Sequence, residues 1–169
     1  MFEQAIEKGN KLRDDNPEES IEAYKEVVSI YKGEYLSETD YEDWLIPIRN
    51  RYERLYLQSL FKLLELLEKS KRYLEIADIC EQAMELIPLN ENLNIYFIKD
   101  LINLGERKYA LSHYEYITTK LYKESKSFPS DEMKRLYKKI KGEGLKNTKI
   151  QLYEIDERLK DEEEQEGAL

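Results

Sequence analysis

The sequence has few of the residues that carry catalysis, metal binding or covalent cross-links. It contains one cysteine, Cys80, and one histidine, His113, among 169 residues. A single cysteine excludes a disulfide within the chain, and this pair cannot supply the ligand set of a zinc site. We find no glycine-rich phosphate loop and no protease or hydrolase motif. The sequence therefore predicts no enzyme, no cofactor and no metal, with Cys80 buried and His113 at least half-buried in packing positions.

Long apolar runs are also missing. No segment approaches the roughly 20 apolar residues that cross a membrane, and Met1-Phe2-Glu3-Gln4 lacks the order of a signal peptide. We therefore expect a cytoplasmic location and no membrane contact. Only 6 glycines and 4 prolines interrupt a chain that is 41% apolar and 37% charged. This composition is typical of a single helical domain with its own core.

The apolar residues that are present follow the period of a helix. Four leucines fall on one face of a long helical pattern that ends at a break over Ser70–Tyr73: Leu60, Leu63, Leu64 and Leu67. A second pattern follows and stops at Ile87-Pro88, because proline has no N–H to continue a helix. Together the two predict an antiparallel helical hairpin. One hairpin cannot cover its own apolar faces, so more hairpins must pack against it.

The second helix of this hairpin recurs along the chain. Its packing positions appear three times, as Ser20, Tyr24 and Val27, as Ile76, Cys80 and Ala83, and as Ala110, Tyr114 and Ile117. The last two copies are 34 residues apart, which is the period of a tetratricopeptide repeat. The first lies 22 residues too early, which indicates an insertion from Tyr31 to about Ile48. We predict an all-α, tetratricopeptide-like right-handed superhelix of about three antiparallel hairpins with C-terminal capping helices.

Turn residues mark the expected helix ends. We expect a first helix over 2–12 with four residues facing inward: Ala5, Ile6, Gly9 and Leu12. Pro17 opens the second helix, and residues 32–40 form an irregular connection in which Asp40 is an N-cap. Later helices are expected from Asn90 or Glu91, over 106–122, and after a Ser130 cap with Met133, Leu136, Tyr137 and Ile140 inward.

The insertion carries a resemblance to a known family. Four segments bear it, Tyr31-Lys32-Gly33-Glu34-Tyr35-Leu36, Asp43-Trp44, Arg49-Asn50-Arg51 and Leu55-Tyr56. They are similar to the bacterial transcriptional activator domain of SARP-type regulators, and the similarity spans about Phe2 to Lys141. It implies a regulatory helical domain at residues 1–141, followed by a C-terminal helix and acidic linker or tail at 142–169. In the family a winged-helix DNA-binding domain usually comes first, so we expect a fragment or a stand-alone module.

The resemblance and the repeats imply different functions. The resemblance implies a non-catalytic regulatory and protein-interaction module of a transcriptional regulator. Its partner would be protein, namely other domains of the regulator, a second copy in a homodimer or the transcription machinery, with DNA reached only through a separate domain. The repeats alone are equally typical of a stand-alone adaptor that binds a peptide or partner protein in its concave groove.

Regular repeats also predict which side chains line that groove. The expected residues are Gln58, Phe61, Glu65 and Glu68 in the second repeat and Asn92, Ile95, Lys99 and Ile102 in the third. The glutamates would repel the terminal carboxylate that chaperone-binding adaptors hold, which disfavours that subtype. Trp44 is a further candidate, either as a packing anchor or as an interface residue.

Charge is unevenly distributed along the chain. Residues 120–149 carry ten basic and four acidic side chains, whereas 154–169 carry two basic and eight acidic ones. The net charge of −9 repels a polyanion at long range, so we expect no DNA binding by this chain alone. The acidic end is either a solvated linker or a segment that neutralises the basic helix in cis.

Overall fold

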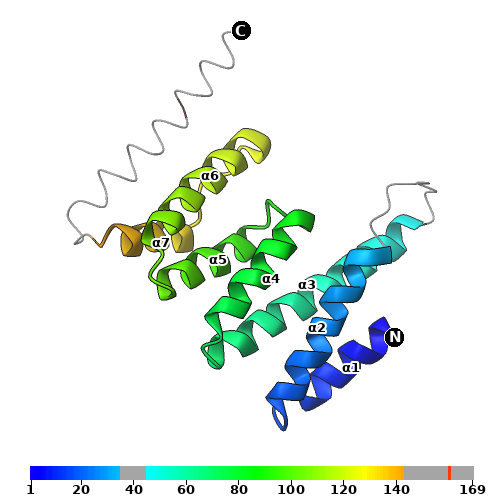
Figure 1. Cartoon of the computed structure of the whole chain (residues 1–169). Helices are drawn as coiled ribbons and strands as arrows, with labels where there is room; N and C mark the ends of the chain where they lie inside the picture. The colour runs from blue at the N-terminus through cyan, green and yellow to red at the C-terminus, as the bar shows by residue number, and fades with distance from the viewer. Residues whose placement is uncertain (35–44, 143–159, 161–169) are drawn as a thin grey trace. The chain divides into compact units, whose positions relative to one another are not determined.

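Every regular element of the described chain is an α-helix. The computed structural model describes residues 1–34, 45–142 and 160, and seven helices fall within these ranges, with no strand among them (Figure 1). This confirms the all-α prediction. The chain divides into two compact units, unit 1 (Met1–Arg72) and unit 2 (Tyr73–Leu169), which we describe separately. Across the described ranges, no helix combines the length and apolar character needed to span a membrane.

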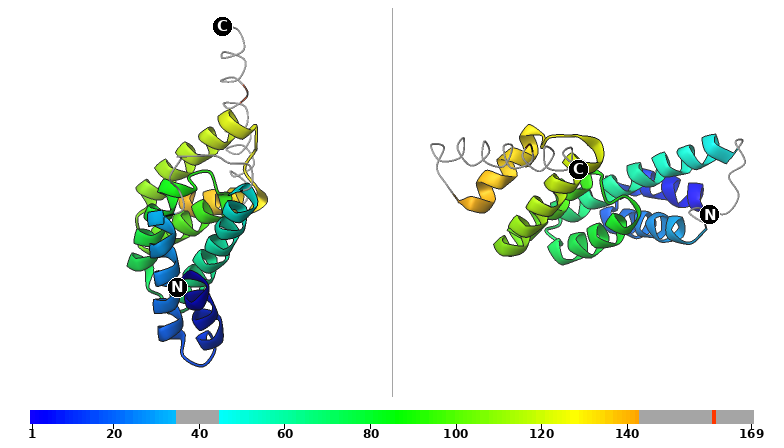
Figure 2. Two further views of the ribbon diagram at one scale, coloured as in Figure 1. Left: turned by 90° about the vertical axis from the view of Figure 1, so that its right-hand side faces the viewer. Right: turned by 90° about the horizontal axis from the view of Figure 1, so that it is seen from above.

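Unit 1 is built from three helices, α1 (Phe2–Leu12), α2 (Pro17–Glu34) and α3 (Ile46–Lys69). α2 packs against both α1 and α3 (Figure 2). Asn16 precedes α2, and its Oδ1 accepts a hydrogen bond from the Glu19 N–H at 3.3 Å. Pro17 occupies the first helical position as expected, where its missing N–H would have no partner in any case.

The α1–α2 hairpin is held by a close approach at Gly9. A Cβ added to this residue would lie 2.6 Å from a ring carbon of Tyr24, so only glycine fits there. The Ser20 hydroxyl donates to the Gly9 carbonyl at 2.7 Å. Ser20 and Tyr24, which make these two contacts, are both repeat positions of α2. The repeat positions therefore face the first helix of their own hairpin.

The boundaries around the insertion differ in part from the expectation. α2 continues to Glu34, so residues 32–34 are helical and not irregular. These three residues carry no apolar period, so periodicity could not predict a helix there. α3 begins at Ile46 with Pro47 in its first turn, where proline is tolerated. The proposed Asp40 cap lies outside the described residues.

In the described part of unit 2 there are four helices, α4 (Tyr73–Leu86), α5 (Glu91–Asn103), α6 (Arg107–Ser125) and α7 (Asp131–Lys141). α5 packs against the other three, and α7 also contacts α6 (Figure 1). The predicted caps are present: Asn90 Oδ1 accepts from the Leu93 N–H at 3.0 Å, and Ser130 Oγ accepts from the Met133 N–H at 3.3 Å. α6 runs three residues beyond its expected end at Tyr122. α7 is thus the predicted capping helix of this unit.

The core confirms the three copies of the repeat. Each of the nine packing positions is at most 2% exposed: Ser20, Tyr24, Val27, Ile76, Cys80, Ala83, Ala110, Tyr114 and Ile117. The four α7 residues expected inward are also buried. In α1 the inward face is rotated, since Phe2 is buried while Ile6 and Leu12 are only half-buried.

Two parts of the architecture stay predictions. The first is the expected hairpin of α3 with α4, because α3 belongs to unit 1 and α4 to unit 2. The second is the right-handed twist of the superhelix. The break between these helices covers residues 70–72, because Tyr73 already belongs to α4.

Candidate protein-interaction surface

One face of α3 forms an open pocket in unit 1. Its lining residues are Asn50, Glu53, Arg54, Leu57, Gln58 and Phe61, which we call the α3 surface. Their spacing repeats every three or four residues and so places them on one side of the helix. Leu57 and Phe61 are half-buried, whereas the four polar residues are exposed. The surface therefore combines two partly exposed apolar side chains with four exposed polar ones.

Two of the predicted groove residues, Gln58 and Phe61, belong to this surface. The other four members were not predicted, although their helical spacing from Phe61 could have identified them. Glu65, a third predicted residue, lies one turn beyond Phe61 and is held in ion pairs with Arg13 and, at 3.2 Å, with Lys69. The hydrogen bond from Lys69, aided by Arg13, lowers the pKa of Glu65. Glu65 is thus a charged side chain with its partners already in place.

A row of polar contacts joins α1 to α3. Glu3 pairs with Arg51 at 3.0 Å, Lys62 Nζ donates to Asn10 Oδ1 at 2.8 Å, and Arg13 pairs with Glu65. Residue numbers increase together along both helices, so α1 and α3 run in the same direction. The first helices of successive repeats have this arrangement. The row fixes the register of α3 against the first hairpin.

Aromatic rings hold the amino-terminal half of α3 in place. Tyr31 stacks on Tyr56 with ring centroids 4.3 Å apart, and Phe2 meets Tyr52 edge to face at 5.4 Å. Phe2 also lies 6.5 Å from Tyr31, so one cluster includes rings from all three helices. Such ring pairs add to the stabilisation from buried area. They anchor the half of α3 that carries the α3 surface.

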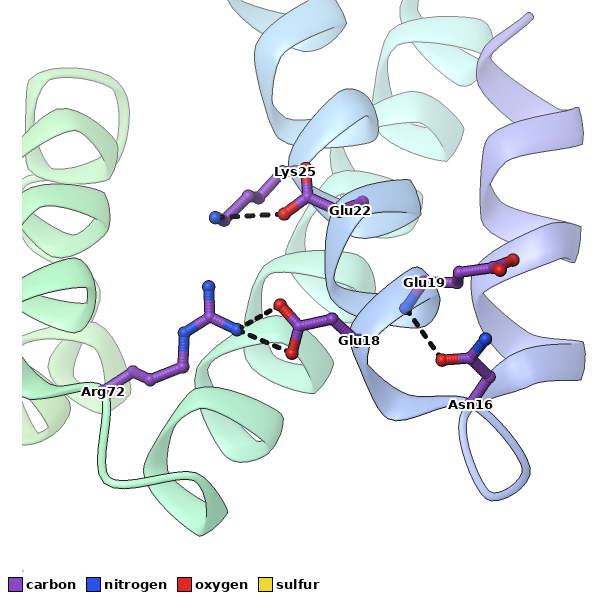
Figure 3. A network of polar contacts seen from close by, with 6 residues as sticks. All are labelled: Asn16, Glu18, Glu19, Glu22, Lys25 and Arg72. Carbon is purple, nitrogen blue, oxygen red and sulfur yellow. Dashed lines mark hydrogen bonds and ion pairs between the residues drawn. The ribbon is translucent and has the colours of Figure 1, made fainter.

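The carboxyl-terminal end of α3 is tied down by Arg72. One guanidinium nitrogen of Arg72 donates to both carboxylate oxygens of Glu18, at 2.8 and 3.1 Å (Figure 3). Glu18 is in the first turn of α2, where a negative charge also favours the helix. Figure 3 shows a second pair on α2, Lys25 with Glu22 at 3.4 Å. Contacts at both ends therefore help to orient α3 within unit 1.

The predicted groove residues of the third repeat all lie on α5 in unit 2. Asn92 is exposed, Lys99 and Ile102 are half-buried, and Ile95 is only 5% exposed. Lys99 Nζ lies 5.6 Å from the centre of the Tyr96 ring. A groove shared by these residues and the α3 surface stays a prediction. Trp44 lies outside the described residues.

His113 has a packing role in unit 2, as expected. Its Nε2 lies 2.7 Å from Asn94 Oδ1, and the Asn94 amide donates to the carbonyls of Pro88 and Asn90 at 3.0 and 2.8 Å. Because the Asn94 oxygen faces the ring, Nε2 carries the proton. The Phe97 ring packs edge to face on His113, with centroids 4.8 Å apart. Burial lowers the pKa of His113 to about 4, so it is neutral at physiological pH.

Cys80 offers no nucleophile. It is fully buried in α4, and burial, with a further contribution from the Asp100 carboxylate, raises the pKa of its thiol far above the usual value. A protonated, inaccessible thiol is unreactive. Within the residues that the structure describes, no group of three or more His, Cys, Asp or Glu side chains could hold a metal ion. The arrangement described here is suited to binding through surfaces.

Comparison with known proteins places this arrangement in a family. The family model of the bacterial transcriptional activator domain matches residues 1–141. The matched range includes all seven helices and ends with α7 at Lys141, which confirms the resemblance drawn from about Phe2 to Lys141. No curated protein and no solved structure shows significant similarity to the chain. The chain therefore belongs to the bacterial transcriptional activator domain family, whose members are regulatory domains of the transcriptional-activator type.

Proposed function

We propose that the chain is a protein-interaction module of a transcriptional regulator, acting together with a separate winged-helix DNA-binding domain. The observation that carries the proposal is the α3 surface, which lies inside the region matched by the family. Leu57 and Phe61 are its apolar members and are partly exposed, and the other four side chains are polar and exposed. Protein interfaces likewise combine apolar and polar side chains.

The surroundings of α3 favour binding without a large cost in ordering. The Tyr31–Tyr56 stack orders the helix before any partner arrives, and ion pairs through Arg51 and Arg72 add a smaller contribution. A preorganised surface loses less conformational entropy on association. Because the α3 surface carries only one arginine and one glutamate, Arg54 and Glu53, it has no excess charge for a phosphate backbone. These features support a protein partner.

A recruitment experiment tests this role. The chain is joined to a DNA-binding domain of known operator, and transcription of a reporter gene is measured in bacteria. We expect the joined chain to change reporter output, and Leu57→Ser combined with Phe61→Ser to remove most of that change. The matched control is Gln4→Ser with Lys8→Ser on the exposed face of α1, which should leave it intact. Circular dichroism checks that each variant is folded.

Two results would contradict the proposal. One is a joined chain that leaves the reporter unchanged. The other is a double variant of the α3 surface that stays folded and retains full activity in the reporter assay.

The chain alone should not bind duplex DNA. Affinity for DNA needs several phosphate contacts and falls steeply with salt, and at about 150 mM salt we expect no binding at micromolar protein. Fluorescence anisotropy of a labelled duplex gives the measurement. Salt-sensitive binding at these concentrations would mean that the chain contacts DNA itself.

Self-association and Trp44 are tested together. A homodimer is one proposed partner arrangement, and sedimentation of the chain over a range of concentrations measures it. If Trp44→Ala unfolds the chain, Trp44 is a packing residue. If the fold persists and association is lost, Trp44 anchors an interface. A stand-alone adaptor role, the second proposal that the repeats support, would instead show as peptide binding that needs no DNA-binding domain.

A further inference from the structure

α7 has one buried face and one basic face. The buried residues are Met133, Leu136, Tyr137 and Ile140. Five basic residues lie on the side of the helix opposite the buried face: Lys134, Arg135, Lys138, Lys139 and Lys141. At about 100° per residue these five form one continuous arc. We call them the α7 basic face.

No carboxylate neutralises this face within the described part of the chain. None of its five side chains forms an ion pair there, although ion pairs occur elsewhere, as between Lys120 and Glu124. The two acidic residues of α7, Asp131 and Glu132, lie in its first turn. They complement the positive end of the helix dipole and leave the last turns basic.

Further positive charge gathers at the end of α7. Arg107 of α6 reaches the helix end, since a Cβ added at Gly142 would lie 3.3 Å from its guanidinium. Along α7, Lys134 and Lys138 are four residues apart, as are Arg135 and Lys139, and like charges at this spacing repel. A partner with several closely spaced negative charges would relieve this repulsion.

The chain itself contains such a segment. Residues 161–166 read Asp-Glu-Glu-Glu-Gln-Glu, with five carboxylates in six positions. We infer that the α7 basic face is a docking surface for this acidic segment of the same chain. The inference is independent of the proposed function, because it uses α7 and not the α3 surface.

The length of the connecting chain permits this contact. Asp161 follows Gly142 by 19 residues, which span up to about 65 Å when extended. α7, with 11 residues, is about 16 Å long. Because the acidic segment belongs to the same molecule, its effective concentration at α7 can reach the millimolar range. Exposed charge pairs are individually weak and screened by salt, so docking is reversible.

Docking would control access to α7. While the acidic segment is bound, the basic face is closed to other anions, and an acidic partner protein must displace the segment to bind. The contact is therefore an internal competitor that selects for partners of high negative charge.

Cross-linking of the full chain tests the contact directly. A carbodiimide joins a lysine amine to a carboxylate only when the two groups touch, and mass spectrometry identifies the linked residues. We expect cross-links between residues 161–166 and the lysines of α7 at low salt, and their loss at about 1 M salt. Lys8 and Lys11 of α1, which are also exposed, are the controls.

Mixing isotopically light and heavy chains separates contacts within one molecule from contacts between two. Cross-links found only between differently labelled chains would overturn the inference in favour of a second copy. Cross-links no more frequent at α7 than at the α1 controls would overturn it altogether.

A variant with a neutral segment gives a second test. It carries Asp161→Asn, Glu162→Gln, Glu163→Gln, Glu164→Gln and Glu166→Gln. Its control neutralises five exposed acidic residues elsewhere: Asp14, Asp15, Glu19, Glu26 and Glu85. Because both changes alter the net charge equally, a difference between them reports the segment and not the overall charge.

The probe is a dye-labelled hexaglutamate peptide, followed by fluorescence anisotropy. Removing the internal competitor should tighten peptide binding roughly threefold or more relative to the control variant. Equal affinities of the two variants would overturn the inference. Tighter binding of duplex DNA without tighter peptide binding would also overturn it, by assigning the face to nucleic acid.

Discussion

His113 is kept neutral by burial, and this links the stability of unit 2 to pH. Its pKa is about 4 in the folded chain and about 6.5 when unfolded, so the unfolded state binds more protons between these values. The stability that depends on a neutral His113 is present above pH 6.5 and is lost as the pH falls toward 4. The loss should be at most about 3 kcal/mol.

Urea unfolding at several pH values, followed by circular dichroism, measures this effect. His113→Gln keeps a donor for Asn94 Oδ1 but cannot titrate. The difference in stability between the native chain and this variant should therefore shrink as the pH falls from 7 to 4. A difference that does not change with pH would show that His113 titrates normally.

Gly9 is the position where a single methyl group should be costly. Gly9→Ala places a Cβ 2.6 Å from the Tyr24 ring, and the overlap should destabilise the chain by about 1–3 kcal/mol. This exceeds the gain of about 0.5–1 kcal/mol that alanine normally brings to a helix. Lys8→Ala, one residue earlier and exposed, is the control and should be nearly neutral.

A double-mutant cycle identifies the cause. In a Tyr24→Leu background the ring is absent, so Gly9→Ala should cost much less. An equal cost in both backgrounds would place the problem outside the Gly9–Tyr24 contact.

At the residue scale the sequence predicted which side chains are buried better than it predicted which side chains they contact. His113 and Cys80 were expected in packing positions, and both are there. The Asn94–His113 contact was missed because it joins residues 19 apart on different helices, and a helical period contains no information about such pairs. Phe2 was missed as a core residue because the inward face of α1 was predicted from four positions, and the observed face is rotated around the helix relative to them.

At the scale of one element, α3 should show a sharp contrast between its core and its surface. Leu64 is fully buried, and Leu64→Ala should cost roughly 2–5 kcal/mol because it leaves a cavity. Leu57→Ala, on the half-buried α3 surface, is the matched control and should cost clearly less. Chemical denaturation measures both. A cost below about 1 kcal/mol for Leu64→Ala would remove it from the core.

Helix ends were predictable where a side chain marks them. Pro17, Asn90 and Ser130 begin their helices as expected, because each either lacks or satisfies an N–H that the helix leaves unpaired. The continuation of α2 to Glu34 was missed, because residues 32–34 carry no apolar period by which a helix could be recognised. Only two of the six residues of the α3 surface were predicted. The repeat pattern predicts which positions face the groove, but it does not predict how far a pocket extends along the helix.

At the scale of the whole molecule, the repeat period predicted the fold class but not the division into two units. A 34-residue offset shows that segments resemble one another, and the nine shared packing positions are buried accordingly. It does not show which neighbouring helices share the most extensive interface. The extent of each interface depends on how the side chains of two complete helix faces fit together, and a single sequence does not reveal this fit.

The helices of this chain pack against partners that are close in sequence. α2 contacts α1 and α3 in unit 1, and the contacting pairs of unit 2 are also at most two helices apart. Proteins with such local contacts fold in microseconds to milliseconds. We expect refolding within milliseconds by stopped-flow circular dichroism. A dominant phase of seconds without proline isomerisation would contradict this.

Local packing has a consequence during synthesis. Unit 1 ends at residue 72, and ribosomes add about 5–20 residues per second. Unit 1 therefore has seconds to fold on the emerging chain before α7 is made. A ribosome-bound chain halted soon after residue 72 has left the exit tunnel should already resist protease, so the surface proposed to meet a partner is complete while the rest of the protein is still being translated.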